Sequence, residues 1–171
     1  MVVEVSKSGL NSAAMSSPGT VTDAFGILLA DHRRIEICFE RYAQSRTAAA
    51  HRTAIADALD AIRLHLSLDA KVLHPAYREF TPDMLGHSRL VEENIALGKR
   101  AEKISLMEPN DPNVEVEMSA LIKHIRAHIE GETNVGGVFE SLLRGGCEPH
   151  MLSRRLQHCR DNHVALGLAA H

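Results

Sequence analysis

Apolar residues recur at helical spacing over four long segments of this chain, and no stretch shows the sustained alternation of a β-strand. The segments cover about residues 22–45, 48–73, 81–107 and 112–134, and short turns join them. A helix with one apolar stripe must bury it against a neighbour, and short connections favour antiparallel neighbours. The sequence therefore predicts an all-α fold, an antiparallel up-down-up-down four-helix bundle with an additional C-terminal helix from about residue 149.

Proline and capping motifs set the expected ends of these helices. Pro75 is expected to close the second helix, because proline lacks a backbone N–H and restricts the residue before it. Thr81-Pro82 predicts the start of the third helix, with a hydroxyl at the N-cap and proline in the first turn. Asp111-Pro112 predicts the start of the fourth helix in the same way.

The apolar stripes are expected to form the core. Each consists of residues three or four positions apart, and the last helix, from about residue 149 to 166, adds a stripe of its own. The assigned stripe residues include Phe25, Leu28, Leu29, Ile35 and Phe39, then Ile55, Leu59, Ile62, Leu66, Val72 and Leu73, then Leu90, Val91, Leu97 and Ile104, then Met118, Leu121, Ile125 and Val135, and finally Met151, Leu152, Leu156 and Cys159.

The composition excludes several classes of protein. A chain of 171 residues with 44% hydrophobic and 24% charged residues is expected to form one soluble domain. We assign residues 1–20, which are rich in serine and glycine, to a flexible arm and residues 21–171 to the helical domain. A net charge of −3 offers no basic face for nucleic acid, and no apolar run is long enough to cross a membrane.

The cysteines and the N-terminus favour the cytoplasm. The three cysteines, Cys38, Cys147 and Cys159, are odd in number and show no Cys-x-x-Cys spacing, so reduced thiols are expected. The first residues lack the pattern of a secretory signal. The sequence leaves open whether the chain is a monomer or a homodimer.

A polar ladder interrupts the apolar face of the fourth predicted helix. His124, His128 and Glu132 are spaced four apart and therefore share one face. Burying imidazoles and a carboxylate is unfavourable unless something pairs with them, and a metal ion suits both ligand types. The chain has 11 histidines, however, and about one His-x-x-x-Asp/Glu match is expected by chance. A metal site is therefore predicted only if the other helices also carry suitable ligands.

Every one of the four long predicted helices carries a histidine on its buried stripe, and the second and fourth add a carboxylate four residues later. These two helices run in the same direction in the predicted topology, so their His–carboxylate pairs can face each other. Four nitrogens and two carboxylates suit two iron-sized ions, although buried hydrogen-bonded polar pairs remain an alternative. The predicted metal ligands are His32, His65, Asp69, His87, His128 and Glu132, with His124 as a further candidate that we expect more readily at the solvent edge.

The stretches that carry these ligands are Asp31-His32-Arg33-Arg34, His65 to Asp69 followed by Leu73-His74-Pro75, Gly86-His87-Ser88-Arg89-Leu90, and His128 to Glu132. Their order and spacing resemble those of the hemerythrin-like, HHE cation-binding domain family. The resemblance covers about residues 22–143. It implies a non-haem di-iron centre, with two iron ions joined by an oxo or hydroxo bridge, that handles dioxygen, nitric oxide, peroxide or iron itself.

The sequence departs from the family pattern at three positions. Asp69 stands where the family usually has glutamate, and its side chain is one methylene shorter. It is expected either to bind one iron terminally instead of bridging both or to tilt the site, and the sequence leaves open whether it bridges. Val91 occupies the place of a second third-helix histidine in oxygen-carrying members, which opens the site to exogenous ligands unless His124 supplies the nitrogen. His74 replaces an aromatic residue, and we do not expect it to be a ligand, because a regular helix places it roughly 180° from His65.

Several functions are compatible with these residues. The resemblance implies a protein that binds or senses O₂, NO or peroxide. A second hypothesis is a catalase-like or peroxidase-like enzyme acting on hydrogen peroxide, because the missing histidine leaves a coordination position open. An iron-donating repair scaffold ranks lower, since residues 1–20 lack the additional histidine and cysteine of such members. A metal-free interaction bundle, whose polar core sets the helix register, is the remaining alternative.

Overall fold

The computed structural model describes residues 24–108 and 111–169, with side chains up to His163. Within these ranges the chain is all-helical and has no strand, so the predicted all-α class is confirmed. The predicted N-terminal arm and the start of the first helix lie outside the described residues. The elements are α1 (Ala24–Gln44), α2 (Ala48–Leu68), the π-helical segment η1 (Asp69–Leu73), α3 (His74–Phe80), α4 (Met84–Ser105), α5 (Val114–Thr133), α6 (Val138–Arg144) and α7 (Pro149–Ala169).

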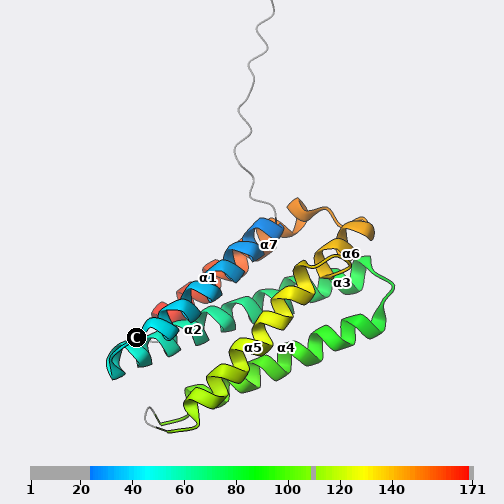
Figure 1. Ribbon diagram of the computed structural model, residues 1–171. Coiled ribbons are helices and arrows are strands. Elements are labelled where there is room, and N and C mark those ends of the chain that lie inside the picture. Colours follow the sequence, from blue (N-terminus) through cyan, green and yellow to red (C-terminus); the bar gives the residue numbers. More distant parts are fainter. Residues whose placement is uncertain (1–23, 109–110, 170–171) are drawn as a thin grey trace, which may run out of the picture.

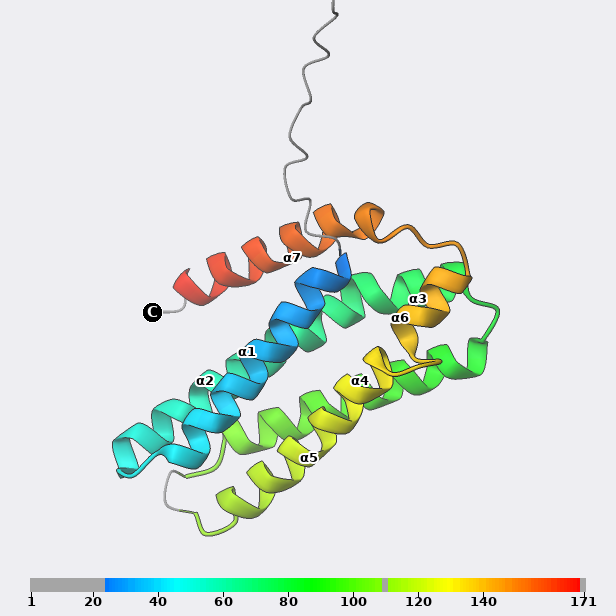
Figure 2. The same ribbon diagram turned by 45° about the horizontal axis from the view of Figure 1, so that its top comes forward.

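The long helices pack side by side. α1 lies along α2, and α4 lies along both α2 and α5 (Figure 1). α7 returns along α1 and also contacts α2, so it covers one side of the α1–α2 pair (Figure 2). No helix in the described ranges combines the length and the apolar character that crossing a membrane requires.

Two apolar clusters fill the core, and a polar layer separates them. In α1 one cluster ends at Leu28 and the other begins at Ile35, with His32 buried between them. In α5 the second cluster ends at Ile125, and the first resumes only at Val138 in α6. The intervening positions carry buried histidines and carboxylates, so the polar residues that the sequence places on the apolar stripes meet in one layer of the core.

The sequence predicted that the second helix ends at Pro75, but the helical backbone continues past this residue. The chain continues from Leu68 through the π-helical segment η1 directly into α3, where Pro75 occupies the first turn. The backbone N–H of His74 donates to the carbonyl of Asp69, five residues back, instead of to residue 70. Proline is tolerated there because the first turn of a helix leaves its N–H groups free of helical bonds.

Two predicted helix starts are also displaced. α4 begins at Met84 with Asp83 as its N-cap, whose side chain accepts a hydrogen bond from the N–H of Gly86. Thr81 instead donates its hydroxyl back to the carbonyl of Tyr77 over 2.7 Å and so caps the end of α3. α5 begins at Val114, and the carboxylate of Asp111 forms a local turn before it. In both cases the side chain of the predicted N-cap forms a local hydrogen bond with the backbone outside the following helix, Thr81 with Tyr77 and Asp111 with Asn113.

Most residues of the predicted stripes are buried or half-buried, but three of them are exposed. Leu29 is 39% exposed, and Met151 at the start of α7 is 65% exposed. Val135 lies beyond the end of α5 and is 96% exposed, because the helix stops at Thr133 before the stripe would reach it. The core-forming stripe of α5 therefore ends with its polar residues.

Candidate metal centre

Four buried side chains of the polar layer converge on one point, and we call them the inner group: His65, Asp69, His128 and Glu132. Each offers one potential ligand atom, and these atoms all lie within 4.8 Å of one another. The end of α2 supplies His65, the start of η1 supplies Asp69, and α5 supplies the other two. The structure thus brings together the two His–carboxylate pairs that the sequence singled out.

The carboxylates lie between the imidazoles. Oδ2 of Asp69 is 3.1 Å from Nε2 of His128 and 3.3 Å from Nε2 of His65. Glu132 lies 3.5 Å from His128 through Oε1 and 3.8 Å from His65 through Oε2. Each carboxylate is therefore close to both histidines, which is an arrangement that suits a shared cation.

His32 on α1 adjoins the inner group. Its Nε2 lies 3.0 Å from Oε2 of Glu132, and its ring meets the ring of His65 edge to face, with centroids 4.7 Å apart. The side chain is 5% exposed. Five of the seven candidate ligands of the sequence analysis are therefore in contact in the core.

Several ligand atoms of this cluster lack hydrogen bonds. Nε2 of His65, Oδ1 of Asp69 and Oε1 of Glu132 are buried and have no hydrogen-bond partner among the described residues. A buried polar atom without a partner costs roughly 1–3 kcal/mol, and more when it is charged. The atoms with unsatisfied lone pairs are the ones that would bind a cation, so the residues fit a metal ion better than they fit a closed hydrogen-bond network.

Burial and neighbouring charges shift the pKa values of the clustered side chains in different directions. Burial lowers the pKa of His32 to about 4 and also lowers that of His65. Burial raises the pKa of Glu132 to about 8, with the charge of Asp69 adding to the effect. Burial would lower the pKa of His128, but the hydrogen bond to Asp69 and the nearby carboxylate of Glu93 raise it to about 10.

Asp69 keeps its charge in this setting. Burial favours its neutral form, yet the electrostatic interaction with the His65 side chain and the hydrogen bond from His128 hold its pKa below the usual value. A carboxylate whose pKa is lowered, beside imidazoles whose pKa values are also lowered, offers the anionic and the neutral ligand types that bind iron and zinc.

Two predicted ligands are not part of this cluster. His124 is about one-third exposed, and its Nε2 lies 3.8 Å from Oε1 of Glu93, in agreement with the expected solvent-edge position. His87 on α4 is half-buried and does not come within the ligand distances of the inner group. His87 was predicted as a ligand from α4, but it is not among the residues that the structure brings together in the inner group.

Two further residues belong to the surroundings of the site, and sequence reasoning missed them. Glu93 on α4 lies with Oε2 3.9 Å from Nδ1 of His128, on the side of the ring that faces away from Asp69. His74 is 3% exposed, although the sequence analysis placed it on the opposite side of the helix from His65. Its burial follows from the π-helical turn, which no side-chain pattern revealed.

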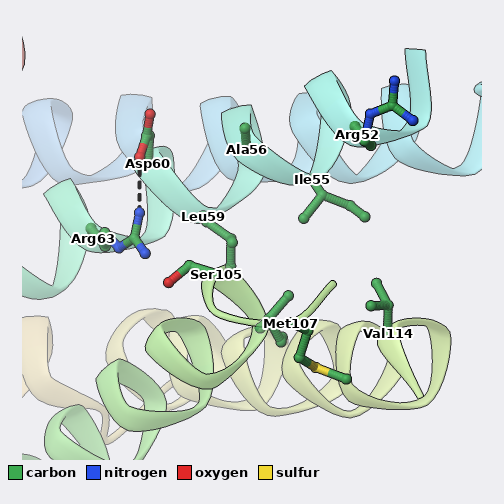
Figure 3. Close-up of a pocket in the computed structure, with 10 residues that line it drawn as sticks. Arg52, Ile55, Ala56, Leu59, Asp60, Arg63, Ser105, Met107 and Val114 are labelled. Carbon is green, nitrogen blue, oxygen red and sulfur yellow. Dashed lines mark hydrogen bonds and ion pairs between the residues drawn. The ribbon is translucent and has the colours of Figure 1, made fainter. Parts of the chain in front are cut away.

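A separate hollow of about 230 Å³ lies between α2 and the facing ends of α4 and α5 (Figure 3). Its walls include Ile55, Leu59 and Met107, and the ion pair of Arg63 with Asp60, 3.2 Å apart, lies at its rim. No member of the inner group lines it. We assign it no part in the metal chemistry.

Comparisons of the chain with known protein families, with curated proteins and with solved structures gave no match. The geometry of the buried cluster is therefore the feature that supports a metal centre. What the structure itself establishes is an all-helical protein with a buried His/Asp/Glu group that could hold a metal ion.

Proposed function

We propose that this chain is a hemerythrin-like, non-haem iron protein that binds or senses O₂, NO or peroxide at the buried His/carboxylate cluster. The observation that carries the proposal is the inner group, in which four ligand atoms from two helical segments lie within 4.8 Å of one another. The proposal includes two iron ions and an antiparallel up-down-up-down arrangement of α1, α2, α4 and α5.

A metal-free polar core accounts less well for the same residues. Such a core is stable only when each buried polar atom finds a partner. Here the atoms without partners include ligand atoms of His65, Asp69 and Glu132. Cations bound by these side chains would give such atoms partners, and they would also offset the repulsion between the two carboxylates.

The protein's own contribution is to hold the ligands and to exclude water. His32 and the inner group are at most 5% exposed, so bulk water does not reach the ligand atoms freely. α2 and η1 fix one His–carboxylate pair, α5 fixes the other, and α1 adds His32. Iron bound here would supply a Lewis-acidic, redox-active centre for a small ligand.

A second candidate function is an enzyme that decomposes hydrogen peroxide. It is favoured by the small number of nitrogens in the cluster, since His87 and His124 lie outside the ligand distances of the inner group. Two ions that share the five clustered side chains would keep coordination positions free for an exogenous ligand. We also propose a cytoplasmic location, since Cys38, Cys147 and Cys159 are free and buried.

Metal content per chain, measured together with the absorption spectrum of the anaerobically iron-loaded protein, tests the proposal. We expect about two irons per chain in the wild type and a clear loss in His65→Ala and His128→Ala. His150→Ala, at an exposed position of α7, is the control and should bind as the wild type does. Addition of NO, azide and peroxide would then separate ligand binding from turnover. Wild-type protein that binds no iron would overturn the proposal.

A further inference from the structure

The π-helical segment η1 changes which residues share a face of the second helix. A backbone bond to the fifth residue back makes one turn a residue longer than an α-helical turn. The bond from the N–H of His74 to the carbonyl of Asp69 is such a bond. Single π-helical turns inside helices occur frequently at functional sites. Here the turn begins at a member of the inner group.

The longer turn brings His74 onto the face of Asp69. In a regular α-helix, His74 would stand roughly 180° from His65, on the opposite side. With one residue absorbed by the turn, it stands about 40° from Asp69, in the relation of residues four apart. His65, Asp69 and His74 therefore form a continuous ladder along this helix, in which each successive residue lies one turn further on.

His74 lies in the core without a partner for its distal nitrogen. The residue is 3% exposed, and its Nε2 has no hydrogen bond among the described residues. Oδ1 of Asp69, the oxygen that does not face His128, has none either. An unpaired imidazole nitrogen and an unpaired carboxylate oxygen on consecutive turns of one helix are an incomplete pair of metal ligands.

The packing of α4 brings His87 to the level of His74. Nδ2 of Asn94 donates to the carbonyl of Leu66 over 3.1 Å, which fixes the register of α4 against α2. The two helices run in opposite directions (Figures 1 and 2), so residues before Asn94 lie level with residues after Leu66. His87 is seven residues before Asn94 and thus lies close to the level of residue 73.

The groups that act electrostatically on His74 agree with this placement. They are the side chains of Asp69, His128, His87 and His65, which come from η1, α5, α4 and α2. Glu93 on α4 is in turn influenced by His74 and by His128. His74 therefore lies where the metal-binding face of its own helix meets those of α4 and α5, although the sequence assigned it no role.

We propose that His74 is a ligand of a second metal position, which it forms with Asp69 and His87 beside the inner group. Asp69 would serve both positions, through Oδ2 in the inner group and through the unpaired Oδ1 at the second position. This inference rests on the proposed function and deepens it, because it locates the second ion. It also names a nitrogen ligand in place of the histidine that Val91 replaces.

Titration with Co²⁺ alone tests the inference, with binding followed by calorimetry, the visible spectrum and metal analysis. Cobalt stands in for iron, because it binds the same ligand types without oxidation in air-free buffer. We expect two Co²⁺ per chain in the wild type. His74→Phe keeps a ring in the core but removes the nitrogen, and it should weaken the second ion at least tenfold while the first remains. The matched control is His150→Phe, at an exposed histidine, which should keep both ions.

The outcomes separate this inference from the proposed function. A His74→Phe variant that binds two ions with unchanged affinity overturns the inference and leaves the proposed function standing. A wild type that binds one ion overturns the inference together with the two-ion part of the proposed function, and leaves only a single-metal site in the inner group. A wild type that binds no metal overturns both. If circular dichroism shows that His74→Phe does not fold, His87→Ala decides the question, because removal of a half-buried side chain disturbs the core less. That variant must also lose the second ion.

Discussion

Nε2 of His128 lies 3.1 Å from Oδ2 of Asp69, across 59 positions of sequence. This contact joins α5 to the π-helical turn, and both side chains are fully buried. At this contact the pKa of Asp69 is lowered and that of His128 is raised, so a cation bound here would have to displace the proton of His128.

Asp69→Asn should weaken metal binding at least tenfold. The amide nearly matches the shape of the carboxylate but removes the negative charge that is shared by His65 and His128. Competition against a chelator of known affinity measures the effect. Asp60→Asn, at an exposed position of α2, is the matched control and should leave the affinity unchanged. Equal affinities for wild type and Asp69→Asn would contradict a ligand role for this residue.

Metal removal should lower the melting temperature. A ligand at 100 times its Kd stabilises the folded state by about 2.7 kcal/mol, since the unfolded chain does not present the cluster. For a domain of this size that corresponds to a shift of about 5–10 °C. Calorimetric melting with and without a chelator measures the shift. His128→Ala should show no such difference, and a chelator effect of the same size in that variant would argue for metal bound elsewhere.

Replacement of His74 should make the metal-free protein less sensitive to acid. Burial lowers the pKa of His74 from 6.5 to about 4, so the unfolded chain takes up this proton first as the pH falls. The wild type therefore loses stability from this residue below pH 6.5, in total about 3 kcal/mol by pH 4. The difference in unfolding free energy between wild type and His74→Phe should change by that amount between pH 7 and pH 4, as measured by urea denaturation at each pH.

The control for this measurement is His150→Phe, at an exposed position of α7. Its difference from the wild type should stay constant over the same range. A constant difference for His74→Phe as well would mean that His74 accepts a proton in the folded state as readily as in the unfolded state.

Arg160→Ala should destabilise the protein through α1. Nη2 of Arg160 on α7 lies 3.3 Å from Oδ1 of Asp31, which is buried next to His32 and has no hydrogen bond among the described residues. Loss of the ion-pair partner of this buried carboxylate should cost about 1–2 kcal/mol, a value reduced because Arg160 is partly exposed. Urea unfolding measures it. In an Asp31→Asn background, the same substitution should have little effect.

Two glycines should respond to alanine in opposite ways. Gly98 lies inside α4 with nothing within 4 Å of an added Cβ, so Gly98→Ala should stabilise the protein by about 0.5–1 kcal/mol. At Gly145 a Cβ would collide with the carbonyl oxygen of Phe80, and Gly145→Ala should destabilise by about 1–3 kcal/mol. Thermal melts of the two variants measure both. Equal shifts would mean that the α3–α6 contact is looser than described.

The sequence predicted the helices and the residues of the buried polar cluster because both depend on local periodicity. His32, His65, Asp69, His128 and Glu132 stand on apolar stripes, and a polar residue in such a place has to meet other polar groups once the helices pack. This reasoning needs only the helical period and the direction of each stripe.

The features that the sequence did not reveal depend on competition between backbone partners. A π-helical turn at Asp69 was not foreseen, because Pro75 gave a stronger signal for a helix end. The prediction that His74 lies on the opposite side of the helix from His65 was wrong for the same reason. Thr81 and Asp83 are both good caps, and only the structure shows that the first closes α3 and the second opens α4. The distance of His87 from the inner group could not be predicted either. It depends on the register of α4 against α2, which the hydrogen bond of Asn94 fixes.

The π-helical turn also has a consequence for how this chain is aligned with others. Such a turn is equivalent to the insertion of one residue into an α-helix. A protein with the same site and a regular helix would be one residue shorter between Asp69 and Pro75, and an alignment without a gap would shift every later position of α3 by one. Deletion of the exposed Ala70 is the corresponding experiment in this chain, since it would let the segment return to regular α-helical geometry with His74 only four residues after Asp69.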